Sequence, residues 1–138
     1  MYGDTGVVRA LARELREQAA DIQAAAVDLR AQSDAVPWTG LAADAMRRLA
    51  HDHASGLVAA AGAHERAAAA LEHHAREVDH VKAVIAAAER RVHGAVDGLA
   101  SGASGLAHGR IGRWLADADL PPPGHLGWVE VRLPRWLP

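Results

Sequence analysis

The chain has 138 residues and a formal net charge of −2, with 15 basic and 17 acidic side chains spread along it. Half of the residues are apolar but only 4% are aromatic, so alanine supplies much of the apolar content. These values predict one modest domain with no basic surface for nucleic acid, and the lack of cysteine excludes disulfides, thiolate metal sites and a cysteine nucleophile.

The sequence shows neither the pattern of a secretory signal peptide nor that of a membrane-crossing helix. Residues 1–6 lack the basic region and apolar core of a secretory signal peptide, so we expect no conventional export signal. No apolar run approaches the roughly 18 residues that a membrane-crossing helix needs. The four-residue spacing of Gly94, Gly98 and Gly102 is typical of packed membrane helices, but the charge of Asp97 argues against a span.

A first helix is predicted from about Thr5 to Ala35, with Asp4 or Thr5 as its cap. Large residues recur every seven positions along it, and small residues run beside them at the complementary spacing. The large row is Val8, Leu15, Ile22, Leu29 and Val36, and the small row is Ala12, Ala19, Ala26 and Ser33. This pattern predicts close antiparallel packing against another helix.

The helical pattern breaks at residues 36–40, where Pro37 and Gly40 bracket a reversal of the chain. Proline biases the preceding residue away from helix, and glycine tolerates backbone angles that other residues avoid. Trp38 lies at the apex of this predicted turn. Thr39 is a plausible cap for the helix that follows, and we interpret Arg47, with its neighbour Arg48, as part of a solvated helix face.

A longer second helix is predicted to run to about His93. Its seam is Ala43, Ala50, Leu57, His64, Leu71, Val78, Ile85, Val92 and Leu99, paired with Met46, His53, Ala60, Ala67, His74, Val81, Ala88 and Ala95. Counted back from the turn, the first helix can cover the second only to about Ala70. We therefore expect another chain or this chain's own tail to cover the more apolar part, and the predicted partner interface is Leu71, Val78, Val81 and Ile85.

The last third of the chain is richer in glycine, proline and tryptophan than the two predicted helices. Glycines at 94–112 predict a linker or frayed helix, followed by a short helix at about 111–118 and an extended stretch at the prolines 121–123. Residues 127–137 alternate apolar and charged residues, as an extended segment does, and include Trp128 and Trp136. We expect these tryptophans to dock on the second helix or, as the less favoured alternative, on a partner. The predicted domains are residues 1–96, a helical hairpin, and residues 97–138, the linker and tail.

Nine histidines raise the question of a metal site. Glu77 and His80 have the spacing found in helical-bundle metal sites, but a di-metal site needs that motif on two helices. The favoured interpretation places His73 and His80 on a polar face and the seam histidines at the edge of an alanine interface. Protonation of the seam histidines near their usual pKa of about 6.5 is a further hypothesis, because it would loosen that interface. No catalytic triad or nucleotide motif is present, so we predict no cofactor and no enzymatic activity.

The tripeptide Trp38-Thr39-Gly40, between two amphipathic helices, resembles the signature of the WXG family of small substrates of the bacterial type VII (ESX) secretion system. The resemblance covers about Gly6 to Val96. It implies an all-α helical hairpin that pairs with a second helical hairpin, as a homodimer or a heterodimer, in a four-helix arrangement. The extended second helix and the tryptophan-bearing tail depart from the family.

The resemblance also implies a composite export signal that contains Trp38 and Gly40. In the family, the turn lies near a helical motif, often on the partner, in which an acidic residue follows an apolar one by four positions and two more apolar residues come after. Residues matching this motif are Ile85, Glu89, Val92 and Val96, with His73 and Glu77 as a second candidate. Ordinary seam packing explains the apolar residues equally well.

The predicted function is therefore that of a type VII secretion substrate, or of a helical targeting partner for a secreted effector. Such a protein contacts the secretion machinery, is cytoplasmic before export and is secreted without a signal peptide. Two alternatives stay open: a cytoplasmic coiled-coil interaction module that binds through Trp128 and Trp136, and a helical metal-binding protein.

Overall fold

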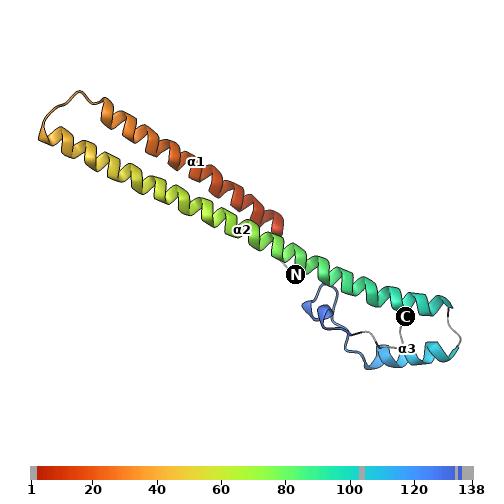
Figure 1. The fold of residues 1–138 in the computed structure, drawn as a ribbon. Helices are drawn as coiled ribbons and strands as arrows, with labels where there is room; N and C mark the ends of the chain where they lie inside the picture. The colour runs from red at the N-terminus through yellow and green to blue at the C-terminus, as the bar shows by residue number, and fades with distance from the viewer. Residues whose placement is uncertain (1–2, 103–104, 133, 135–138) are drawn as a thin grey trace. The chain divides into compact units, whose positions relative to one another are not determined.

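The computed structural model describes residues 3–102, 105–132 and 134. Its helices are α1 (Thr5–Ala35), α2 (Leu41–Gly102) and α3 (Gly105–Asp117), followed by the short 3-10 helix η1 (Leu126–Val129) (Figure 1). The described residues contain no β-strand, so the predicted all-α class is confirmed.

Helix α1 begins and ends where the sequence predicts. The Asp4 carboxylate accepts the N–H of Gly6 at 2.8 Å, which satisfies one of the free donors of the first turn. The helix ends at Ala35, and Val36 is already extended because Pro37 follows it. Its buried residues are the predicted small row, Ala12, Ala19, Ala26 and Ser33.

Contacts divide the chain into two compact units, one of residues Asp4–Arg76 and the other of Met1–Gly3 with Glu77–Pro138. The boundary predicted at residue 96 follows the rise in glycine content. The division by contacts comes earlier along α2, between Arg76 and Glu77.

In the first unit, α1 runs beside the first part of α2 in the opposite direction (Figure 1). Three side-chain contacts set this alignment: Asp34 with His51 at 2.9 Å, Arg30 with Ser55 at 3.0 Å, and Arg16 with Glu72 at 2.6 Å. As residue numbers fall along α1 they rise along α2, which defines antiparallel neighbours.

Alanines form the buried surface between these helices. In the first unit the buried row of α2 comprises Ala43, Ala50, Ala54, Ala61, Ala68 and Ala75, while Leu57, His64 and Leu71 are half-buried beside it. The predicted second row is wrong over most of this unit, because His53, Ala67 and His74 are exposed. From Ala50 onward, the alignment with α1 places innermost the residues that lie four positions after each seam residue, and not those three positions after it.

Of the two alternatives predicted for the glycines of residues 94–102, a linker and a frayed helix, the linker is wrong. Helix α2 continues through Gly94 and Gly98 to Gly102. Glycine costs about 1 kcal/mol relative to alanine within a helix, and here Ala95 and Val96 between the glycines are half-buried. Helix α3 likewise begins earlier than predicted, and residues 126–129 form the 3-10 helix in place of an extended segment.

Over the described residues, none of the helices combines the length and apolar character required to cross a membrane.

Candidate functional site

The turn between α1 and α2 depends on one glycine. Gly40 has φ of +102°, a conformation that side chains with a Cβ rarely adopt, and it directly precedes the first residue of α2. Its carbonyl accepts the N–H of Asp44 at 3.0 Å, the first helical hydrogen bond. Gly40, and not the predicted Thr39, therefore lies at the helix boundary.

The Arg47 side chain forms hydrogen bonds that stabilise this turn. Its Nη2 donates to the carbonyls of Val36 at 2.8 Å and Trp38 at 2.7 Å, and its Nη1 donates to Asp44 at 3.3 Å. A guanidinium presents several donors in a fixed plane, so a single side chain can satisfy carbonyls on both sides of Pro37. The interpretation of Arg47 as a solvated face residue is wrong. The sequence signal for this role is the position of Arg47 about two turns into α2, within reach of the carbonyls beside Pro37.

The Trp38 indole is 64% exposed although its backbone is fixed by Arg47. Two further aliphatic residues near the turn are open to solvent, Leu41 at 89% and Leu49 at 58% exposed. Tryptophan is among the residues that most often contribute strongly to binding when a partner buries them. The turn thus presents a large apolar side chain from a fixed backbone.

The second set of predicted site residues lies on the part of α2 in the other unit. Ile85, Glu89, Val92 and Val96 share one helical face, as their spacing requires. Ile85 is 2% and Val92 3% exposed, whereas Glu89 and Val96 are half-buried.

Trp128 of η1 covers this face. Its side chain is 3% exposed and forms a buried cluster with Ile85, Ala88 and Val92. Trp114, Leu120 and Val131 pack against the same cluster. The indole Nε1 donates to the Pro122 carbonyl at 2.9 Å, so the polar atom of the buried ring is satisfied. The preferred expectation that the tail docks on its own chain is confirmed for Trp128, and Trp136 lies outside the described residues.

Glu89 makes a polar contact with the same tail. Its carboxylate accepts the backbone N–H of Gly124, a residue with φ of +76° in the turn after the prolines. The His125 N–H donates to the Pro122 carbonyl at 3.1 Å, and the His125 Nδ1 accepts the Gly127 N–H at 3.0 Å. These bonds hold the turn in which the Gly124 N–H points to Glu89. They also form the beginning of η1, from which the Trp128 side chain packs against α2.

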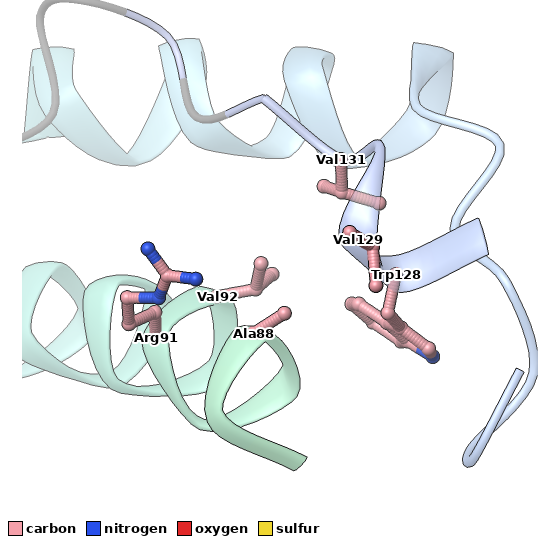
Figure 2. Close-up of a pocket in the computed structure, with 6 residues that line it drawn as sticks. All are labelled: Ala88, Arg91, Val92, Trp128, Val129 and Val131. Atoms are coloured by element: carbon pink, nitrogen blue, oxygen red, sulfur yellow. The ribbon is translucent and has the colours of Figure 1, made fainter. Parts of the chain in front are cut away.

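A cavity of about 230 Å³ remains beside Trp128. Figure 2 shows its lining, with Ala88, Arg91 and Val92 on α2 facing Trp128, Val129 and Val131 on the tail. The ring of His93 lies 5.9 Å from the Trp128 ring, measured between centroids. The tail therefore covers the apolar face without filling all the space above it.

The residues predicted as a partner interface differ in exposure. Leu71, Val78 and Val81 are half-buried, and Val81 packs against the Trp128 cluster. Ile85 is already buried by the tail, so it is not an open surface in this structure. The sequence predicted that either another chain or this chain's own tail would cover the apolar part of α2. In this structure the tail covers Ile85 and Val92.

Two histidines of the first unit contact neighbouring groups, one of them across the two helices and the other within α2. His51 pairs with Asp34, and the His64 Nδ1 contacts the Ala60 carbonyl at 2.9 Å, while His53 and His74 are exposed and not in the seam as predicted. Within the described ranges, no group of three or more histidine or acidic side chains is arranged to hold a metal ion.

One ion pair of the first unit joins Arg16 to Glu72 at 2.6 Å. The hydrogen bond from Arg16, helped by its positive charge, lowers the pKa of Glu72, and the same bond raises the pKa of Arg16. Both side chains are half-buried, so water screens much of this attraction.

Comparisons of the chain with protein-family models, with curated proteins and with solved structures find no match.

Proposed function

We propose that this chain is a helical hairpin that acts in type VII secretion, as a substrate or as a helical targeting partner for a secreted effector. The observation that carries this proposal is the turn: Trp38 is 64% exposed on a backbone held by Arg47 and Gly40. An exposed tryptophan that contributes little to a core is suited to recognition by a partner. The order tryptophan, any residue, glycine at this turn matches the family signature described above.

The second part of the proposal is pairing with another hairpin. In α1, Leu15, Ile22 and Leu29 lie three positions after the buried alanines, whereas Arg16 and Arg30 lie four positions after them. Residues three and four positions along a helix flank opposite sides of a row. One flank of α1 is therefore aliphatic and the other is polar.

Helix α2 repeats this asymmetry. Leu71 lies three positions after the buried Ala68, and Glu72 lies four after it. Because Glu72 pairs with Arg16, the polar flanks of both helices are on the same side, and the aliphatic flanks share the other. Half-buried residues on this aliphatic side are Leu15, Ile22, Leu29, Leu57 and Leu71. A second helical hairpin laid on this side completes their burial and gives the four-helix arrangement.

The export signal of the proposal combines Trp38 and Gly40 with Ile85, Glu89, Val92 and Val96. The test measures the protein in culture supernatant, with and without the secretion ATPase, for the wild type and Trp38→Ala. We expect ATPase-dependent export of the wild type and a loss of at least about tenfold for Trp38→Ala, the size typical of removing a dominant contact.

Leu41→Ala is the matched control, because Leu41 is even more exposed at the same turn and lies outside the signature. It should be exported like the wild type. Equal supernatant levels for all strains and variants would contradict the proposal.

Sedimentation tests the pairing. Ile22→Glu places a charge on the aliphatic side and should shift a homodimer to monomer, whereas Ala24→Glu, at an exposed position of α1, should leave it unchanged. A wild type that is monomeric at high concentration contradicts a homodimer.

A further inference from the structure

The tail contacts the same residues that the proposed function assigns to the helical half of the export signal. Trp128 buries Ile85 and Val92, and the Gly124 N–H occupies the Glu89 carboxylate. Two apolar residues and the acidic residue of one motif are therefore engaged at once. A partner that reads this motif needs the surface that the tail covers.

We propose that the tail is an intramolecular cover that competes with the secretion partner for residues 85–92 of α2. The inference rests on the proposed function, since it takes that motif as the surface to be read. With the tail docked, the motif is hidden. When the tail leaves, the apolar stripe of α2 and the Glu89 carboxylate become available to a helical partner.

The construction of the tail suits a cover that can be displaced. Of the three large apolar side chains in η1, only Trp128 is buried, while Leu126 and Val129 are each 51% exposed. A partly open pocket of about 230 Å³ lies at the edge of the contact beside Trp128, so the tail does not fill all of the space next to α2. Unfilled space removes dispersion contacts, so this interface is weaker than a fully packed one of equal extent.

The polar contact is exchangeable as well. Glu89 receives one backbone N–H from the tail and is half-buried, so water or another donor can replace that bond. A partner helix that supplies apolar side chains to Ile85 and Val92 and a donor to Glu89 reproduces every tail contact named here. It can also fill the cavity that the tail leaves.

The cover can be measured directly because the chain has no cysteine. In Ala88→Cys, a single thiol lies under Trp128, at a position that is 6% exposed and outside the motif. Its rate of reaction with a small thiol reagent reports opening of the tail. Adding Trp128→Ala should raise the rate at least about tenfold, because local opening limits access to buried groups, and adding Trp128→Phe should raise it much less.

Ala54→Cys is the control, since Ala54 is fully buried in the first unit and should react equally slowly with or without Trp128. An equal rate for the Ala88→Cys thiol in both tail backgrounds overturns the cover. A faster rate at both thiols also overturns it, because the tail variant would then have loosened the whole fold.

Export supplies the functional readout. Trp128→Ala should increase ATPase-dependent export or recovery of the partner complex at least about twofold over the wild type, because exposure of the motif increases the competent fraction. If the wild type is exported and Trp128→Ala is exported no better, the cover has no regulatory role and the inference fails alone. If no variant is exported, the proposed function fails, and the regulatory role with it.

Discussion

The two compact units bury their apolar surface in opposite ways. In residues 4–76, the contact between α1 and α2 is spread over two rows of alanines, and the large aliphatic side chains lie half-buried at the edge. In residues 77–138, one tryptophan supplies the centre of the contact, and Ile85 and Val92 are fully covered. The same helix α2 takes part in both.

This contrast determines how each contact responds to change. Alanine rows bring two backbones close together, so added volume has nowhere to go, and each single methyl group supplies only a small part of the buried contact. A contact centred on Trp128 tolerates changes around it and is lost when that ring is removed. The first unit is thus sensitive to larger residues, and the second to one smaller residue.

The largest expected effect is that of Trp128→Ala, which should destabilise the docked tail by about 3 kcal/mol, as for other buried aromatic truncations. Hydrogen exchange of the Gly124 amide, which is bonded to Glu89, measures this loss. Leu126→Ala, at an exposed position of the same 3-10 helix, should change the exchange by less than about 0.5 kcal/mol. Similar exchange for both variants would remove the contrast between the units.

Ala26→Leu tests the alanine rows. Ala26 is fully buried between α1 and α2, so the larger side chain should lower the free energy of unfolding of the first unit by about 2 kcal/mol. Urea unfolding followed by circular dichroism gives this value. Ala25→Leu, one position along and exposed, should be nearly neutral; if it were as harmful as Ala26→Leu, the close packing described here would be incorrect.

A smaller effect is expected at the turn. Gly40→Ala forces a side chain into φ of +102° and should destabilise the first unit by about 1 kcal/mol, although open space surrounds the position. Gly56→Ala also meets open space but lies within α2, so it should stabilise by up to about 1 kcal/mol. Thermal unfolding compares the two, and changes of the same sign would contradict the backbone argument.

The smallest effect belongs to the ion pair between Arg16 and Glu72. The pKa of Glu72 is lowered in the folded chain, so its contribution is present above the ordinary glutamate range and is lost as pH falls through the lowered value. Glu72→Gln should therefore lower the Tm slightly at about pH 6, and the difference from the wild type should shrink as pH falls through the lowered pKa of Glu72. A difference that does not change with pH would assign the loss to packing.

The sequence predicted α1 closely because its signals are local. Asp4 offers a cap, Pro37 ends the helix, and the period of seven identifies Ala12, Ala19 and Ala26 as one row. The sequence did not predict correctly which alanines of α2 face α1. Ala54, Ala61 and Ala67 have the same side chain, so the sequence pattern alone does not separate buried from exposed positions in this alanine-rich helix. The contacts of Arg16 and Arg30 with α2 belong to the alignment in which Ala61 is buried and Ala67 is exposed.

The sequence by itself determined the all-α class, the bounds of α1 and the need of the apolar end of α2 for a cover. The tertiary structure decided what provides that cover in this chain, namely Trp128, with Gly124 on Glu89. It also decided that Arg47 secures the turn and that α2 persists through Gly94 and Gly98. The physical reason is range: caps, periodicity and proline act within a few residues, whereas these contacts join atoms that only folding brings together.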